Sequence, residues 1–170
     1  MSSATSHEHA ALLRGLAIQR EHIFEALDGL PVDDLRRPVL PSHWTCLGLV
    51  NHLSVDVERF WFQAVVAGEP GAVGDVLASA DNAWEVATDT SAGEVFGAYR
   101  RAIEQADTVI AACSLDAPPA WWPGNLFGTW RLGSVREIVL HVLAETATHA
   151  GHLDAARELI DGKQNLVLTD

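Results

Sequence analysis

The chain has 170 residues, 48% of them hydrophobic, which is enough for one domain over residues 1–170 with a continuous buried core. Its formal net charge is −12, so its surface would repel nucleic acid and anionic lipid, and neither is an expected partner. No apolar stretch approaches the roughly 20 residues that a membrane span needs, and the first residues do not resemble a signal peptide.

Two long helices are expected in the first part of the chain. From about Ser6 to Leu27, apolar residues recur at nearly helical spacing, and a Gly-Leu-Pro stop follows. Residues 31–43 contain further prolines and are expected to form a loop. Thr45 is then a suitable N-cap for a second helix, which ends before Gly68.

The second half of the chain predicts two more long helices. Residues 72–90 are ambiguous and leave room for one short helix. Ser91 and Ser134 are each followed three positions later by Glu, the capping-box pattern, and predict helices that run to about Ser114 and Ile160. No segment alternates convincingly as a β-strand. The expected fold is therefore all-α: a four-helix bundle of the up-down-down-up type, with a long crossover between its second and third helices.

Four polar residues interrupt the apolar face of the last predicted helix. At about 100° per residue, His141, Glu145, His149 and His152 fall within about 80° of one another on a helical wheel. A buried imidazole or carboxylate needs a partner, and His52 lies on an apolar stripe of the second helix. Such a set of N and O donors is typical of a divalent metal site, although a single histidine on an apolar face is more often a core residue. Spacing alone does not select which three of the five would bind.

Two segments resemble a known family. Residues 44–53, Trp-Thr-Cys-Leu-Gly-Leu-Val-Asn-His-Leu, resemble the second-helix signature of the DinB-like superfamily, which includes mycothiol-dependent maleylpyruvate isomerase. Residues 145–152, Glu-Thr-Ala-Thr-His-Ala-Gly-His, are similar to the last-helix motif of its DUF664 branch. The resemblance covers essentially the whole chain in helix order. It implies a four-helix bundle that holds one divalent metal ion.

The resemblance also implies the ligands. In this superfamily a His of the second helix joins a pair of residues four apart on the last helix, and the isomerase branch has Glu and then His in that pair. The implied ligands are therefore His52, Glu145 and His149. Zinc is the expected ion, and nickel or iron would also suit such ligands.

Three residues near this set have further roles to consider. His152 is the candidate catalytic residue, in the role of a general base. It could equally be a fourth metal ligand or a residue that orients one of the ligands. Asp56, one turn beyond His52, could orient that ring, although a solvated Asp is at least as common. His141 is expected to pack or to form a hydrogen bond one turn before the site.

Other features allow two interpretations each. Cys46 lies beside a predicted helix N-terminus, which lowers a thiol pKa, but no base is identifiable nearby, so a packing role is favoured over a nucleophile. Cys46 and Cys113 are far apart and form no disulfide framework, which favours a cytoplasmic protein. Aromatic residues between the last two helices either wall a substrate pocket or, more commonly, cap the core: Trp121, Trp122, Phe127 and Trp130.

The function that the resemblance implies is S-transfer. The metal would lower the pKa of a coordinated thiol, a small-molecule thiol such as mycothiol or bacillithiol would attack a small electrophile, and His152 would move a proton. Two alternatives stay open: a small hydrolase that uses metal-activated water, and a non-catalytic stress-related module whose ion only stabilises the bundle. Relatives often pair as dimers, so a homodimer is also expected.

Overall fold

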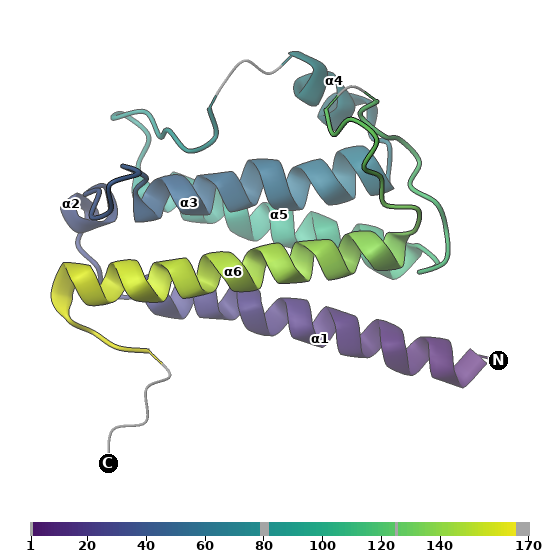
Figure 1. Ribbon diagram of the computed structural model, residues 1–170, viewed down its shortest axis with the longest axis horizontal. Helices are drawn as coiled ribbons and strands as arrows, with labels where there is room; N and C mark the ends of the chain where they lie inside the picture. The colour runs from purple at the N-terminus through teal and green to yellow at the C-terminus, as the bar shows by residue number, and fades with distance from the viewer. Residues whose placement is uncertain (1, 79–81, 125, 166–170) are drawn as a thin grey trace.

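The computed structural model describes residues 2–78, 82–124 and 126–165, and in these ranges it contains helices and loops but no strand (Figure 1). The long helical segments are α1 (Ser2–Leu27), α3 (Cys46–His52) with its direct continuation η1 (Leu53–Val66), α5 (Ala92–Ala112) and α6 (Val135–Asp161). Two short helices, α2 (Val32–Leu35) and α4 (Pro70–Ala78), lie in the connections.

The four long segments form the predicted bundle (Figure 1). α1 and α6 run in one direction, and α3 with η1 and α5 run in the other. α1 packs along α6, and α5 packs along η1. The second and third long segments are parallel, so the end of η1 and the start of α5 lie at opposite ends of the bundle. Residues 67–91 connect these two ends and form the crossover. The prediction of an all-α bundle is confirmed.

The helix starts lie where their capping residues predict. The side chains of Thr45, Ser91 and Ser134 each accept a hydrogen bond from the backbone N–H three residues further on. At Ser91 the bond is reciprocal, because the Glu94 carboxylate accepts from the Ser91 N–H at 2.7 Å. At the other end of α6, Gly162 adopts a φ of 79°, a left-handed conformation that favours glycine.

Three bounds differ from the expectation. α1 begins at Ser2, because no proline or glycine interrupts the residues before Ser6. The segment expected to be a loop contains α2, which buries Leu35 and has two Asp residues in its first turn, where the helix dipole favours them. The second long helix is α-helical only to His52; η1 has π-type bonds that span five residues, such as Ala67 N–H to the Phe62 carbonyl at 3.0 Å.

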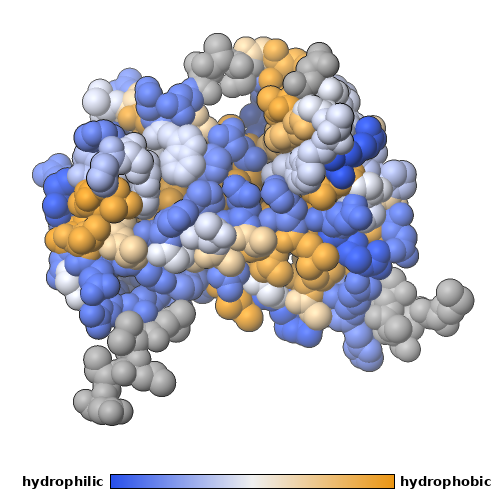
Figure 2. Space-filling model, viewed as in Figure 1, coloured by the Kyte–Doolittle hydropathy of each residue, from blue (hydrophilic) through white to orange (hydrophobic). Residues whose placement is uncertain are grey.

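The surface of the described residues is mixed in polarity. Figure 2 shows a largely hydrophilic face with hydrophobic patches over α4 and along α6. Exposed leucines lie on these helices, Leu77 on α4 and Leu140 and Leu159 on α6. Among the described residues, no helix is both long enough and apolar enough to cross a bilayer.

A buried ion pair lies inside the bundle. Arg20 of α1 is 3% exposed and Glu58 of η1 is 0% exposed. The Arg20 guanidinium donates two hydrogen bonds to the Glu58 carboxylate, at 2.7 and 2.6 Å, and a third to Asp107 of α5 at 2.7 Å. Burial raises the pKa of the Glu58 carboxyl, and the charge and hydrogen bonds of Arg20 oppose that rise. One guanidinium therefore connects three of the four long segments.

Replacing Arg20 with Met is expected to lower the free energy of unfolding by about 3–5 kcal/mol, because Glu58 stays buried without its partner. Urea denaturation followed by circular dichroism measures the loss. The exposed Arg14, also on α1, is the matched control, and Arg14→Met should change stability by less than about 0.5 kcal/mol. The double variant Arg20→Met/Glu58→Leu should recover most of the loss. Equal stability of Arg20→Met and the native protein would contradict the pairing.

Candidate metal centre

The fold brings together His52, Glu145 and His149. His52 is the last residue of α3, and the other two are one turn apart on α6. One donor atom of each residue lies within 4.8 Å of the others. The two imidazoles meet edge to face, with ring centroids 5.1 Å apart, and His149 Nε2 lies 3.6 Å from a Glu145 carboxylate oxygen. A single ion placed between the helices would be within reach of all three.

Burial differs among the three residues and favours one charge state of His149. The His52 and His149 side chains are 13% and 10% exposed, whereas Glu145 is 36% exposed and opens the group to solvent. Burial lowers the pKa of His149, and the neighbouring His52 lowers it further. The neutral imidazole is therefore favoured, which is the form that binds a metal. Two imidazoles and one carboxylate form a donor set that fits a divalent ion with positions left open.

Side chains beside the group orient its rings. The Asp56 carboxylate accepts a hydrogen bond from His52 Nδ1 at 2.9 Å, which directs Nε2 away from Asp56 and leaves it free to coordinate. His152 is exposed, and its Nδ1 lies 3.5 Å from Nδ1 of His149, the ring nitrogen other than the one near Glu145. This geometry favours His152 as a partner of the His149 ring rather than as a fourth ligand.

His141 and Cys46 differ in their relation to the group. His141 Nε2 lies 3.7 Å from a Glu145 carboxylate oxygen, one turn before it on α6. Cys46 is buried at the start of α3, and burial raises the pKa of its thiol to about 11. A thiol with this pKa is protonated at neutral pH, so the packing role is the one that the structure supports.

Trp84, which the sequence did not single out, covers one side of the group. Its ring stacks on His52, with centroids 4.2 Å apart and planes 19° from parallel, and meets His149 edge-on at 5.7 Å. Trp84 belongs to the crossover between η1 and α5, in the stretch 72–90 that showed no clear pattern. No local signal could have found it, because its role depends on a contact with residues distant in the sequence.

Two residues of α3 hold the crossover against the site. The side-chain amide of Asn51 donates a hydrogen bond to the Ala83 carbonyl at 2.8 Å. At Gly48 the crossover approaches so closely that an added Cβ would lie 2.2 Å from the Trp84 carbonyl oxygen. The glycine is thus required by packing, since its backbone is ordinary helix.

The opposite side of the group is open. A pocket of about 460 Å³ reaches His52 and Glu145, and its lining includes His141, Phe127 and Trp130. Four aromatic residues were considered as pocket walls from the sequence, and of these Phe127 and Trp130 line the pocket. Trp122 instead packs against Trp61, with ring centroids 5.9 Å apart. The backbone N–H of Trp121 donates a hydrogen bond to the Val65 carbonyl. A larger hollow of about 780 Å³ between η1, α4 and the crossover contains none of the three candidate ligands.

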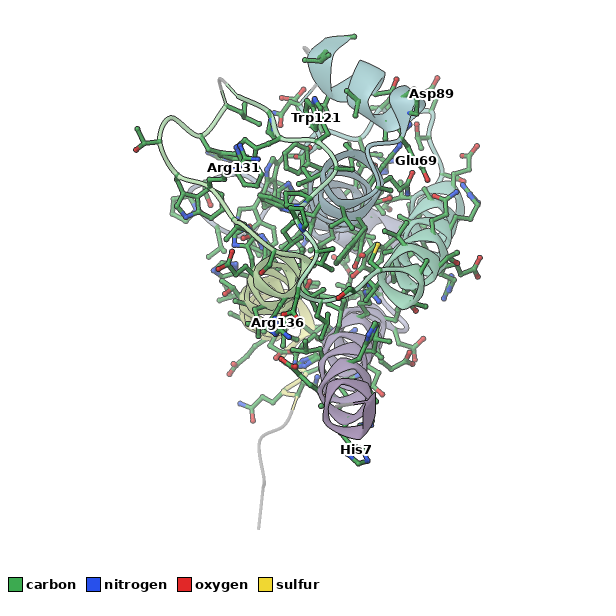
Figure 3. All side chains as sticks on the ribbon, turned by 90° about the vertical axis from the view of Figure 1, so that its right-hand side faces the viewer. His7, Glu69, Asp89, Trp121, Arg131 and Arg136 are labelled. Atoms are coloured by element: carbon green, nitrogen blue, oxygen red, sulfur yellow. The ribbon has the colours of Figure 1, made fainter. Side chains whose placement is uncertain are left out.

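Figure 3 shows the end of the bundle at which this pocket's loop lies. The loop between α5 and α6 carries Trp121 and Arg131 past the end of η1 and down to Arg136, at the start of α6. The N–H groups of Ala120 and Trp121 donate to the Val66 and Val65 carbonyls, at 3.2 and 3.1 Å. These bonds attach the loop to η1.

Replacing Gly48 with Ala is expected to lower the free energy of unfolding by about 1–3 kcal/mol, because the new methyl group forces the Trp84 carbonyl away. Urea denaturation measures this loss in the free energy of unfolding. The control is Gly151→Ala, at a helical position of α6 with no atom within 4 Å of the added Cβ; it should raise stability by about 0.5–1 kcal/mol. A Gly48→Ala protein as stable as Gly151→Ala would contradict the close approach.

Comparison with known families assigns the chain to one of them. A family model described as mycothiol-S-transferase matches residues 11–162, which extend from α1 to the residue after α6 and contain all three candidate ligands. Comparisons with curated proteins and with solved structures gave no match. The match confirms the suspected DinB-like relationship. The chain belongs to the mycothiol-S-transferase family of DinB-like proteins.

Proposed function

We propose that this protein is a divalent-metal-dependent transferase that joins a small thiol of the mycothiol type to a small electrophile. The observation that carries the proposal is the convergence of His52, Glu145 and His149, with one donor atom of each within 4.8 Å of the others, beside an open pocket. Membership of the mycothiol-S-transferase family supports the thiol and the reaction class.

The proposed ligands suit thiol activation. His52, Glu145 and His149 would hold the ion, with zinc expected and nickel or iron as alternatives. A divalent ion held by these residues would lower the pKa of a thiol that coordinates it. Two neutral imidazoles and one carboxylate compensate only part of a divalent charge, so the site keeps an attraction for an anionic sulfur. Trp84 and Asp56 hold the His52 ring in place from two directions.

The transfer itself needs few groups from the protein. The thiol loses its proton, its sulfur forms a bond to the electrophilic carbon, and the bond from that carbon to the leaving group breaks with the electron pair leaving on that group. His141 lines the pocket and is outside the proposed ligand set, so we assign to it acceptance of the thiol proton. To His152, which contacts the far nitrogen of His149, we assign the orientation of that ligand.

Mass spectrometry of the untagged protein should find about one divalent ion per chain. His52→Ala, Glu145→Ala and His149→Ala should each lose it while keeping their helical circular dichroism, because the buried apolar residues of the bundle are unchanged in these variants. His152→Ala should keep the ion with roughly 10–100-fold lower affinity, as expected for a residue that orients a ligand.

His7→Ala is the matched control for the metal measurement, because His7 is exposed on α1 and is not one of the three residues whose donor atoms converge. It should bind the ion as the native protein does. A native protein that is metal-free and resists reloading would mean that the polar residues of α6 form only a hydrogen-bonded core network, and it would remove the basis of the proposal.

Incubation with mycothiol and a panel of alkyl halides and epoxides, whose leaving groups are the halide and the ring oxygen, should give thioether products. Turnover should fall by more than about 100-fold in metal-stripped protein and in His52→Ala, and His141→Asn should lower kcat by roughly 100-fold without loss of metal. Chromatography of the thioether product measures the rate. Hydrolysis of esters without any thiol would instead support the hydrolase, and the absence of both activities in metal-loaded protein would refute an enzymatic role.

A further inference from the structure

Four aromatic rings that contact one another line the pocket beside the candidate metal centre, and this cluster is called the aromatic box. Trp61 and Phe127 are nearly parallel, with planes 10° apart and centroids 5.7 Å apart. Trp130 stands almost perpendicular to both, at 86° and 82°. Phe60 meets Phe127 edge to face at 6.0 Å. All four line the pocket, so a molecule in it meets an aromatic wall that offers both ring faces and ring edges.

The two halves of the box come from different elements. Phe60 and Trp61 belong to η1 and are 9% and 4% exposed, so they form a wall fixed by the core. Phe127 and Trp130 come from the loop between α5 and α6, and Trp130 is 44% exposed. A large aromatic side chain that stays in contact with water next to other rings is typical of a ligand-binding surface.

His141 joins the box to the candidate metal centre. Its ring lies 4.8 Å from that of Trp61 and 5.4 Å from that of Trp130, and its Nε2 lies 3.7 Å from Glu145. A group that packs against the aromatic box would therefore lie next to the proposed ligands. The volume of about 460 Å³ lies within the range of roughly 300–1,000 Å³ typical of small-molecule sites.

The charges around the pocket argue against an anionic ligand. None of the described residues that line it is Lys or Arg, and the two carboxylates there belong to Asp56 and Glu145. Both carboxylates face histidines, Asp56 through its hydrogen bond to His52. The nearby Arg131 guanidinium lies over the Trp122 ring at 5.5 Å, and neither residue lines the pocket. An anion would have no positive side chain there, and a cation would have to compete with the histidines for the two carboxylates.

We infer that the electrophile packs a planar, uncharged aromatic group against the aromatic box, which places its reactive carbon toward His141 and Glu145. The inference rests on the proposed function, because it names the substrate class of the same site. Offset-stacked and edge-to-face ring contacts select flat aromatic groups over saturated ones of the same size. The protein would accordingly act on arylalkyl electrophiles in preference to aliphatic ones.

Calorimetric titration with two unreactive probes tests the inference without any thiol. The probes are 2-naphthalenemethanol and decahydro-2-naphthalenemethanol, which share a carbon skeleton and differ in planarity. The aromatic probe should bind roughly ten-fold more tightly, although the saturated one is the more hydrophobic. The titrations are run on the protein as purified and again after metal removal, which separates ring binding from coordination of the hydroxyl group.

Variants of Trp130 test whether the aromatic probe binds at the aromatic box. Trp130→Ala should weaken binding of the aromatic probe roughly ten-fold, and Trp130→Phe should restore most of the affinity. Leu159→Ala, an exposed apolar residue of α6 outside the pocket, should bind both probes as the native protein does. Helical circular dichroism confirms that each variant is folded.

Three outcomes would overturn the inference: equal or tighter binding of the saturated probe, no effect of Trp130→Ala, or binding of (2-naphthylmethyl)trimethylammonium more than ten-fold tighter than the alcohol, which would indicate a site for cations. Failure of the proposed function is a separate result. If the aromatic probe binds through Trp130 but no thiol is transferred, the aromatic subsite stands and the transferase proposal fails.

Discussion

The buried pair of Arg20 and Glu58 is the interaction that constrains the rest of the bundle. Apolar helix faces are held by shape and burial, whereas a carboxylate with no exposure also needs one particular partner, its guanidinium. Glu58 lies on the same continuous helix as His52, so the pair fixes the rotation of that helix about its axis. The direction in which His52 faces α6 therefore depends on an ion pair inside the bundle.

The candidate metal centre is built from two helices and the crossover. α3 and α6 supply the three proposed ligands from regular helices, where side-chain directions are well defined. The crossover supplies Trp84, whose position depends on Asn51 and on the missing side chain of Gly48. One side of the centre is thus closed by a stacked indole, and an incoming molecule must use the other side.

The open side explains why two histidines on one stripe have different surroundings. His141 lies toward the loop between α5 and α6 and lines the pocket, whereas His152 lies one turn beyond His149 and is exposed. Both share a face of α6 with Glu145. Only the neighbouring elements distinguish them, because the aromatic residues of η1 and the loop surround His141.

Local chemistry in the sequence was sufficient for the fold, whereas the three candidate ligands were selected by the resemblance to a known family. The caps at Thr45, Ser91 and Ser134 predicted the helix starts, because capping uses atoms only three residues apart. Four-residue spacing placed Glu145 and His149 on one face of α6, and the motif they belong to indicated the family. Their binding of a metal remains a prediction.

The tertiary structure decided everything that depends on residues distant in the chain. Arg20 and Glu58 are 38 positions apart, and neither interrupts its helix pattern in a way that reveals a partner. Trp84 reaches His52 only because the crossover folds back over α3. The choice between His141 and His152 as the histidine of the pocket has the same origin. Helical periodicity tells which side chains share a face, but only packing between helices determines what that face meets.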